Sequence, residues 1–188
     1  FLRIHNTGHL PVQNLRLLMR CGWETEKEDP NLDIYIGAIE AGKDYDYDLV
    51  RPGIALFGGN PTPTEFNPMT EVVHLRGKII QVREIDTPQS VGYGATYRVA
   101  GPQRIATVPV GYADGYPRAL SAKGKASIAG LSVPIVGRVS MDLITLDVTD
   151  VPKCSAQPGA WADLIGGEGP SLDDIATQAG TIGYEVLT

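Results

Sequence analysis

The sequence predicts a mainly β fold for residues 61–188. Three observations support this prediction: short β-rich segments recur along this part, turns containing Gly, Pro or Asp separate most of them, and several prolines lie at its start, in 60–70. Short strands at this spacing are typical of a β-barrel or a sandwich-like domain. The proline-containing segment is interpreted as a linker, which divides the chain into residues 1–60 and 61–188. The expected β segments are 72–85, 95–99, 104–110, 125–128, 132–136 and 143–148.

Before the linker, the pattern favours three elements. Leucines near helical spacing predict a short helix over 13–21. The run DIYIGAI predicts a strand over 33–39. Residues 48–58 are expected to form a strand, a turn and a short helix. After the linker, Ala129-Gly130 predicts a hairpin over 125–136.

Near the end of the chain, Ser171 followed by acidic residues predicts a helix start, because a serine oxygen can accept from orphan amides there. Gly180 is the expected C-terminal cap of that helix, because glycine tolerates the left-handed conformation that such caps require.

Composition excludes several classes of function. The formal net charge is −6 and the basic residues are scattered, which argues against a nucleic-acid partner. No apolar run reaches the roughly 18 residues of a membrane span, and arginines interrupt any signal-peptide core near the start. Two distant cysteines are expected to be reduced thiols in a cytoplasmic protein, and the three histidines form no cluster that would bind a metal.

Two segments have residues suited to chemistry. A strand-like run ends at Val110 and delivers Tyr112 into a turn rich in Gly, Asp and Pro, where a phenol can face a cleft and act as an acid or base. Earlier, Arg51 offers a fixed fork of donors. The Pro52-Gly53 pair suits the first turn of a helix, where backbone amides can bind an anion.

Five segments taken together resemble the alanine racemase family, whose members interconvert L- and D-alanine with pyridoxal 5'-phosphate (PLP). The resemblance covers roughly residues 37–188. Its motifs are RPGIALFG, VGYGATY, VGYADGYPR, GRVSMD and IGYEV, at residues 51–58, 91–97, 110–118, 137–142 and 182–186.

The resemblance implies a division of the chain and a biological role. Residues 1–60 would be a remnant of the α/β (TIM-type) barrel that binds PLP, with 1–36 poorly matched, and 61–188 would be the C-terminal β-domain. The enzyme would work as a homodimer on alanine, and its D-alanine would feed peptidoglycan synthesis.

The resemblance also assigns site residues. Arg51 would donate to the pyridine nitrogen of PLP, Gly53 and Ile54 would bind its phosphate through backbone amides, and the Tyr184 hydroxyl would contact that phosphate. Tyr112 would be the base on the L-alanine face, reaching the active site of the opposite subunit. The Met141 backbone N–H would meet the substrate carboxylate across the dimer interface.

A lysine that holds PLP and serves as the second base is also required. None of the six lysines lies in the family's AVVKADAYG-like context, so this chain by itself is predicted to be inactive. Two alternatives stay open: a related PLP enzyme, either a racemase of broader specificity or a decarboxylase-like relative, and an inactive β module that dimerises or binds a partner.

Overall fold

The computed structural model describes residues 2–6, 15–19, 53–60 and 66–188, with only the backbone of the first two ranges. The chain forms two compact units, residues 1–72 and 73–188. The strand predicted over 33–39 and the loop at 61–65 lie outside the described residues.

In the first unit, β1 (Leu2–Asn6) pairs with β2 (Leu15–Met19) in an antiparallel hairpin, so the helix predicted over 13–21 is wrong. The run LRLLM carries apolar residues at alternate positions as well as near helical spacing, and a run this short does not distinguish the two periods. A short isolated helix is marginal, whereas strand pairing satisfies the backbone groups of both segments. The 3-10 helix η1 (Ile54–Phe57) follows later in this unit.

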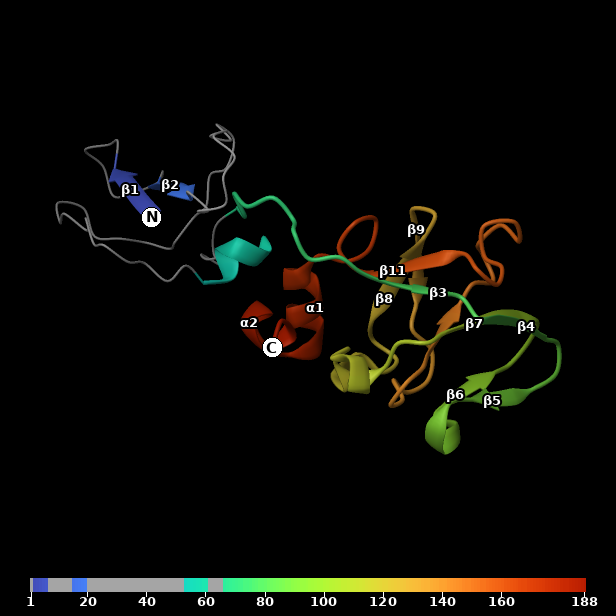
Figure 1. Ribbon diagram of the computed structural model, residues 1–188. Helices are drawn as coiled ribbons and strands as arrows, with labels where there is room; N and C mark the ends of the chain where they lie inside the picture. Colours follow the sequence, from blue (N-terminus) through green and yellow to red (C-terminus); the bar gives the residue numbers. More distant parts are fainter. Residues whose placement is uncertain (1, 7–14, 20–52, 61–65) are drawn as a thin grey trace. The chain divides into compact units, whose positions relative to one another are not determined.

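The second unit consists of small antiparallel sheets, which confirms the prediction of a mainly β fold (Figure 1). One sheet has the order β10-β7-β4, another β3-β11-β8-β9, and β5 pairs with β6. A bridge between Ile135 and Leu146 joins the chain after β9 to β10. The strands are β3 (Leu75–Lys78), β4 (Gln81–Ile85), β5 (Gln89–Val91), β6 (Tyr97–Val99), β7 (Gln103–Val108), β8 (Lys125–Ile128), β9 (Leu131–Pro134), β10 (Ile144–Asp147) and β11 (Trp161–Ile165).

Each predicted β segment overlaps at least one of these strands, and the hairpin over 125–136 is confirmed as β8–β9. Its turn residues Ala129 and Gly130 both have positive φ, 50° and 76°, as a two-residue hairpin with a matching twist requires. Strands β5 and β11 were not predicted. Three further 3-10 helices connect strands: η2 (Tyr93–Ala95), η3 (Tyr112–Asp114) and η4 (Arg118–Leu120).

The core of the second unit lies between these strands. Val108 and Leu146 from one sheet, and Leu164 and Ile128 from the other, are almost completely buried. Burying a side chain of this size contributes roughly 1.5–3 kcal/mol, so the two sheets hold the connecting turns rigidly. The turns of the candidate site connect the strands of these two sheets.

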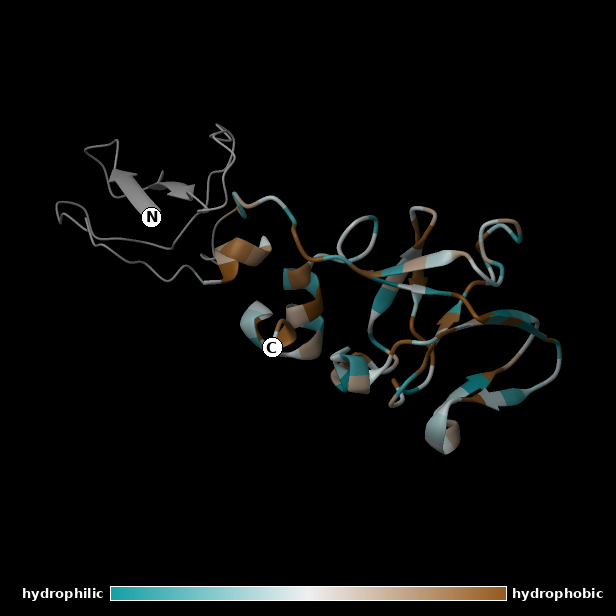
Figure 2. Cartoon of the chain, in the orientation of Figure 1, coloured by the Kyte–Doolittle hydropathy of each residue, from teal (hydrophilic) through white to brown (hydrophobic). Residues whose placement is uncertain are grey.

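Helix α1 (Leu172–Ala179) has the predicted boundaries. The Ser171 hydroxyl accepts from the Asp174 amide at 3.1 Å, and Gly180 adopts the left-handed conformation (φ 78°). Leu172 and Ile175 are buried, which makes the helix amphipathic, as its mixed colouring in Figure 2 shows. Helix α1 packs against η4 and against α2 (Gly183–Val186), which ends the fold.

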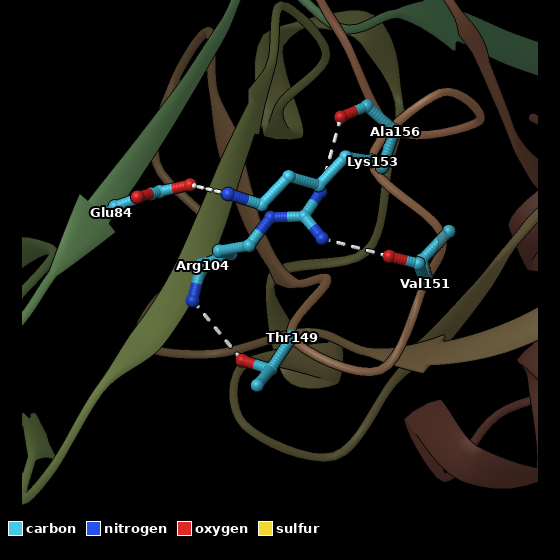
Figure 3. A network of polar contacts seen from close by, with 6 residues as sticks. All are labelled: Glu84, Arg104, Thr149, Val151, Lys153 and Ala156. Carbon is cyan, nitrogen blue, oxygen red and sulfur yellow. Dashed lines mark hydrogen bonds and ion pairs between the residues drawn. The ribbon is translucent and has the colours of Figure 1, made fainter.

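Arg104 on β7 ties the 149–156 loop to the sheet (Figure 3). Its guanidinium donates to the carbonyl of Val151 at 2.8 Å and to that of Ala156 at 3.3 Å, and its backbone N–H donates to Thr149 Oγ1 at 3.1 Å. One side chain therefore satisfies two backbone acceptors of this loop.

Replacing Arg104 with alanine is expected to lower the free energy of unfolding by about 1–3 kcal/mol, because two partly buried carbonyls lose charge-assisted hydrogen bonds. Urea denaturation of the full-length protein measures this loss. Arg83→Ala on β4, an exposed arginine, is the matched control. Equal losses in both variants would contradict the role assigned to Arg104.

Lys153 and Glu84, close to Arg104 in Figure 3, form an exposed ion pair at 2.5 Å. The hydrogen bond from Lys153, followed by its charge, lowers the pKa of Glu84. The pair therefore favours the folded state above the ordinary pKa of a glutamate and loses this effect as the pH falls. Because both groups are exposed, it adds little to stability.

Candidate active site

The first component of the site is the turn 111–116, which continues directly from β7. Asp114 Oδ2 accepts from the Gly111 amide at 2.9 Å, and Gly115 closes the turn with a φ of 90°. The Tyr116 amide also donates a hydrogen bond to the Gly111 carbonyl, at 3.2 Å. This compact turn holds Tyr112 at its outer edge with 43% of its surface exposed.

The second component is the loop 137–143, which leads into β10. Met141 lies at its outer edge, 53% exposed. The Tyr112 amide donates to the Ser140 carbonyl at 3.0 Å, and the Ala113 amide donates to the Met141 carbonyl at 2.9 Å. The structure thus brings together two of the residues selected from the sequence, Tyr112 and Met141.

The two turns touch so closely that no side chain fits between them. A Cβ on Gly111 would lie 2.2 Å from the Met141 carbonyl oxygen and 2.4 Å from that of Ser140. The backbone of Gly111 is extended (φ −149°, ψ −163°), so the need for glycine is steric and not conformational. The contact fixes the position of Tyr112 relative to the loop.

The Met141 amide differs from its neighbours in this loop. The carbonyls of Ser140 and Met141 and the amide of Ser140 are all used in backbone hydrogen bonds. Within the part of the chain that the structure describes, no acceptor faces the Met141 N–H. A rigidly held amide of an exposed residue is suited to bind an oxygen of an anionic ligand.

Tyr116, the second tyrosine of the same turn, is fully buried, and burial raises its pKa. Such a phenol stays protonated at neutral pH and has no access to a substrate. Tyr116 therefore has a structural role, and the exposed tyrosines are the candidates for proton transfer.

Tyr93 is an exposed tyrosine to which the sequence analysis gave no role. It lies at the end of the β5–β6 hairpin, is 72% exposed, and is flanked by Gly92, Gly94 and Ala95, all with positive φ. A Cβ on Gly94 would lie 3.4 Å from Arg138 Nη1, so this hairpin borders the start of the 137–143 loop. The glycines on both sides of Tyr93 in the VGYGATY segment are the sequence signal that could have identified this turn.

Tyr184 lies in α2 and is 51% exposed, and Gly183 beside it is buried. In the first unit, Gly53 is the N-terminal cap of η1 and is half-buried, and Ile54 is the buried first residue of that helix. Arg51 lies outside the described residues. The structure gives no position of Gly53 or Ile54 relative to the tyrosines, because these residues belong to different units.

A further polar contact, outside these turns, joins β11 to β3 and to the residue just before β3. His74 Nε2 is 2.8 Å from Asp163 Oδ1, and Arg76 Nε is 3.7 Å from the same oxygen. Across residues 53–60 and 66–188, no group of three or more His, Cys, Asp or Glu side chains is placed to hold a metal ion. His74 is therefore the partner of a carboxylate in this structure.

The fold and these turns define a mainly β domain in which two interlocked turns hold exposed side chains at the end of a small antiparallel sheet. The family model described as "Alanine racemase, C-terminal domain" matches residues 72–188. The chain therefore belongs to the alanine racemase family, of which it contains the C-terminal domain.

Comparison with individual relatives leads to the same family. The chain is 56% identical over 150 residues to an alanine racemase of Rhodospirillum rubrum, which covers 80% of this chain and 40% of the relative. It is 47% identical over 152 residues to a protein of Agrobacterium fabrum named "Alanine racemase, catabolic", which covers 81% of this chain and 39% of the relative. The chain thus spans about two fifths of the length of the curated relatives it matches.

Solved structures give the same result. Alanine racemase from Bartonella henselae, whose crystal structure contains covalently bound pyridoxal phosphate, matches with a TM-score of 0.70 and 43% identity over 78% of this chain and 40% of that one. The biosynthetic alanine racemase from Pseudomonas aeruginosa matches with a TM-score of 0.66 and 39% identity over 73% of this chain and 38% of that one.

Proposed function

We propose that the full-length protein to which this chain belongs is a PLP-dependent alanine racemase, and that this domain supplies one of its two bases and a contact to the substrate carboxylate. The observation that carries the proposal is the pair of interlocked turns, which hold an exposed tyrosine beside the Met141 amide, for which the described residues supply no acceptor. Family membership supports the choice of alanine and of PLP.

The residues present fit the cofactor in their chemistry. Gly53 has no side chain to obstruct a phosphate at the start of η1, and the family resemblance assigns the phosphate to the backbone amides of Gly53 and Ile54. Tyr184 is a half-exposed tyrosine, and Arg51 would supply a cation for the ring nitrogen. When bound, PLP makes the α-proton of the attached amino acid removable.

The protein's own contribution is positioning and proton transfer. The Met141 N–H would bind one carboxylate oxygen of alanine, which orients the α-carbon. A phenol oxygen on the L face would then remove or return the α-proton, and the lysine that holds the cofactor would serve the D face. A second copy of the protein is proposed to accept this tyrosine and amide into its own site, which makes the working enzyme a homodimer.

Two tyrosines compete for the role of base. Tyr112 is the choice from the sequence, and its backbone bond to the Met141 loop favours it. Tyr93 is more exposed and projects from a hairpin end, which favours its reach into another subunit's site. Both assignments agree with a phenolic base from this domain, and substitution of each tyrosine distinguishes them.

The setting of the enzyme follows from the same proposal. No helix among the described residues is long and apolar enough to cross a membrane. We propose a cytoplasmic enzyme whose D-alanine enters peptidoglycan synthesis. Relatives named biosynthetic and catabolic both match, so the opposite use, breakdown of alanine, is the alternative role for the same reaction.

The test is racemisation by the full-length protein supplied with PLP. We expect L-alanine to lose its optical rotation until both enantiomers are equal, with much slower turnover of larger L-amino acids. Equal rates across a panel of amino acids would favour a broad-specificity racemase. The 188-residue chain alone is expected to be inactive, and a full-length protein without racemase activity would support the non-enzymatic β module instead.

A further inference from the structure

We propose that Ser140 is a positioning residue that fixes the Met141 amide in the direction required by the substrate carboxylate. The inference rests on the proposed racemase function and extends it to a side chain that touches neither substrate nor cofactor. The hydroxyl acts through the turn between Ser140 and Leu143.

Three hydrogen bonds between the same two residues close this turn. Ser140 Oγ donates to the Leu143 carbonyl at 2.8 Å and accepts from the Leu143 amide at 3.0 Å. The Ser140 amide also donates to the Leu143 carbonyl, at 3.0 Å. In the described part of the chain, the Ser140 hydroxyl is the only group that accepts a hydrogen bond from the Leu143 N–H. Loss of this hydroxyl therefore leaves that N–H without a protein partner.

The closed turn leaves the Met141 amide little freedom. The peptide unit between Ser140 and Met141 contains both the Ser140 carbonyl, which accepts from Tyr112, and the Met141 N–H. Because a peptide unit is planar, fixing its carbonyl on one side aims its N–H on the other. The Ser140 side chain holds the next peptides of the turn, so the whole unit cannot rotate without breaking its bonds.

The segment before the turn is held as well. The Val139 amide donates to Ser121 Oγ at 3.0 Å, and that hydroxyl donates to the Arg118 carbonyl at 2.6 Å. The loop is thus anchored on its N-terminal side by Ser121 and closed on its C-terminal side by Ser140. Of these two serines, only Ser140 lies next to the amide assigned to the substrate.

A loosened turn would weaken binding of the carboxylate more than the chemical step, because the amide contacts the carboxylate before and during proton transfer. An interaction made equally in both states changes KM and leaves kcat nearly unchanged. A general loss of folding would instead lower the amount of active enzyme and leave KM unaffected. The ratio of the two effects therefore separates positioning from stability.

The experiment compares Ser140→Ala, Ser140→Thr and the control Ser132→Ala in the full-length holoenzyme. Ser132 is an exposed serine on β9. We expect Ser140→Ala to raise KM for L-alanine roughly five- to tenfold, as for the loss of about one hydrogen bond, and to change kcat less than about twofold. The inhibition constant of propionate, a carboxylate without an amine, should rise in parallel. Ser140→Thr and Ser132→Ala should resemble the parent.

Hydrogen exchange of the peptide that contains residues 137–146 supplies a readout that does not depend on activity. Ser140→Ala should exchange faster there, and Ser132→Ala should not. This inference alone would be overturned if the parent enzyme racemised alanine and Ser140→Ala left both the KM for L-alanine and the inhibition constant of propionate unchanged. A parent that does not racemise alanine would overturn the proposed function as well.

Discussion

Replacing Gly111 with alanine is expected to lower the free energy of unfolding by about 3 kcal/mol and to abolish most of the activity. The new methyl group would lie 2.2 Å from the Met141 carbonyl oxygen and 2.4 Å from the Ser140 carbonyl oxygen. Both are backbone atoms, so the two turns must separate, and overpacking at such a contact typically costs 1–3 kcal/mol or more. Denaturation and racemisation of the same preparation measure both effects.

The control for this substitution is Gly101→Ala. A Cβ on Gly101 meets nothing within 4 Å, and its φ is not in the left-handed region. Alanine should therefore be tolerated there without loss of stability or activity. If Gly111→Ala behaved like Gly101→Ala, the close contact between the two turns would be wrong.

Replacing the catalytic tyrosine with phenylalanine is expected to lower kcat about 10²- to 10⁴-fold, the usual contribution of a positioned base. We expect this loss in one of Tyr112→Phe and Tyr93→Phe, both of which remove only a hydroxyl from an exposed ring. Folding should be unaffected, since neither hydroxyl has a hydrogen-bond partner among the described residues.

Tyr116→Phe is the matched control, because the Tyr116 hydroxyl is buried without a hydrogen-bond partner in the described part of the chain. Removing an unpaired buried hydroxyl should leave activity intact and stability unchanged or slightly higher. Full activity in both Tyr112→Phe and Tyr93→Phe would contradict the proposal that this domain supplies a base.

Local chemistry made much of the β-domain predictable. The Ala129-Gly130 turn and the Ser171 cap are each determined by a few neighbouring residues, and both are found as expected. Strand β11 was missed because Trp161–Ile165 lacks the alternating pattern, and its pairing with β3 and β8 depends on residues far away in the chain. The five residues of β2 were taken as helical because their short apolar pattern fits both periods.

The candidate site was predictable in its residue types but not in its geometry. Tyr112 and Tyr116 lie in the same turn, and the folded core shows that the first is exposed and the second buried. The role proposed for Ser140 depends on Leu143 and on the turn 111–116, far earlier in the chain, which no local motif indicates. Arg51, Gly53, Ile54, Met141 and Tyr184 remain predictions for the assembled enzyme.

The most direct test of the central claim is α-proton exchange in deuterium oxide by the full-length holoenzyme with its catalytic tyrosine replaced by phenylalanine. If a tyrosine of this domain serves the L face, D-alanine should still gain α-deuterium through the lysine without becoming L-alanine, and L-alanine should keep its α-proton. Exchange of L-alanine at the parent's rate in both Tyr112→Phe and Tyr93→Phe would contradict the account.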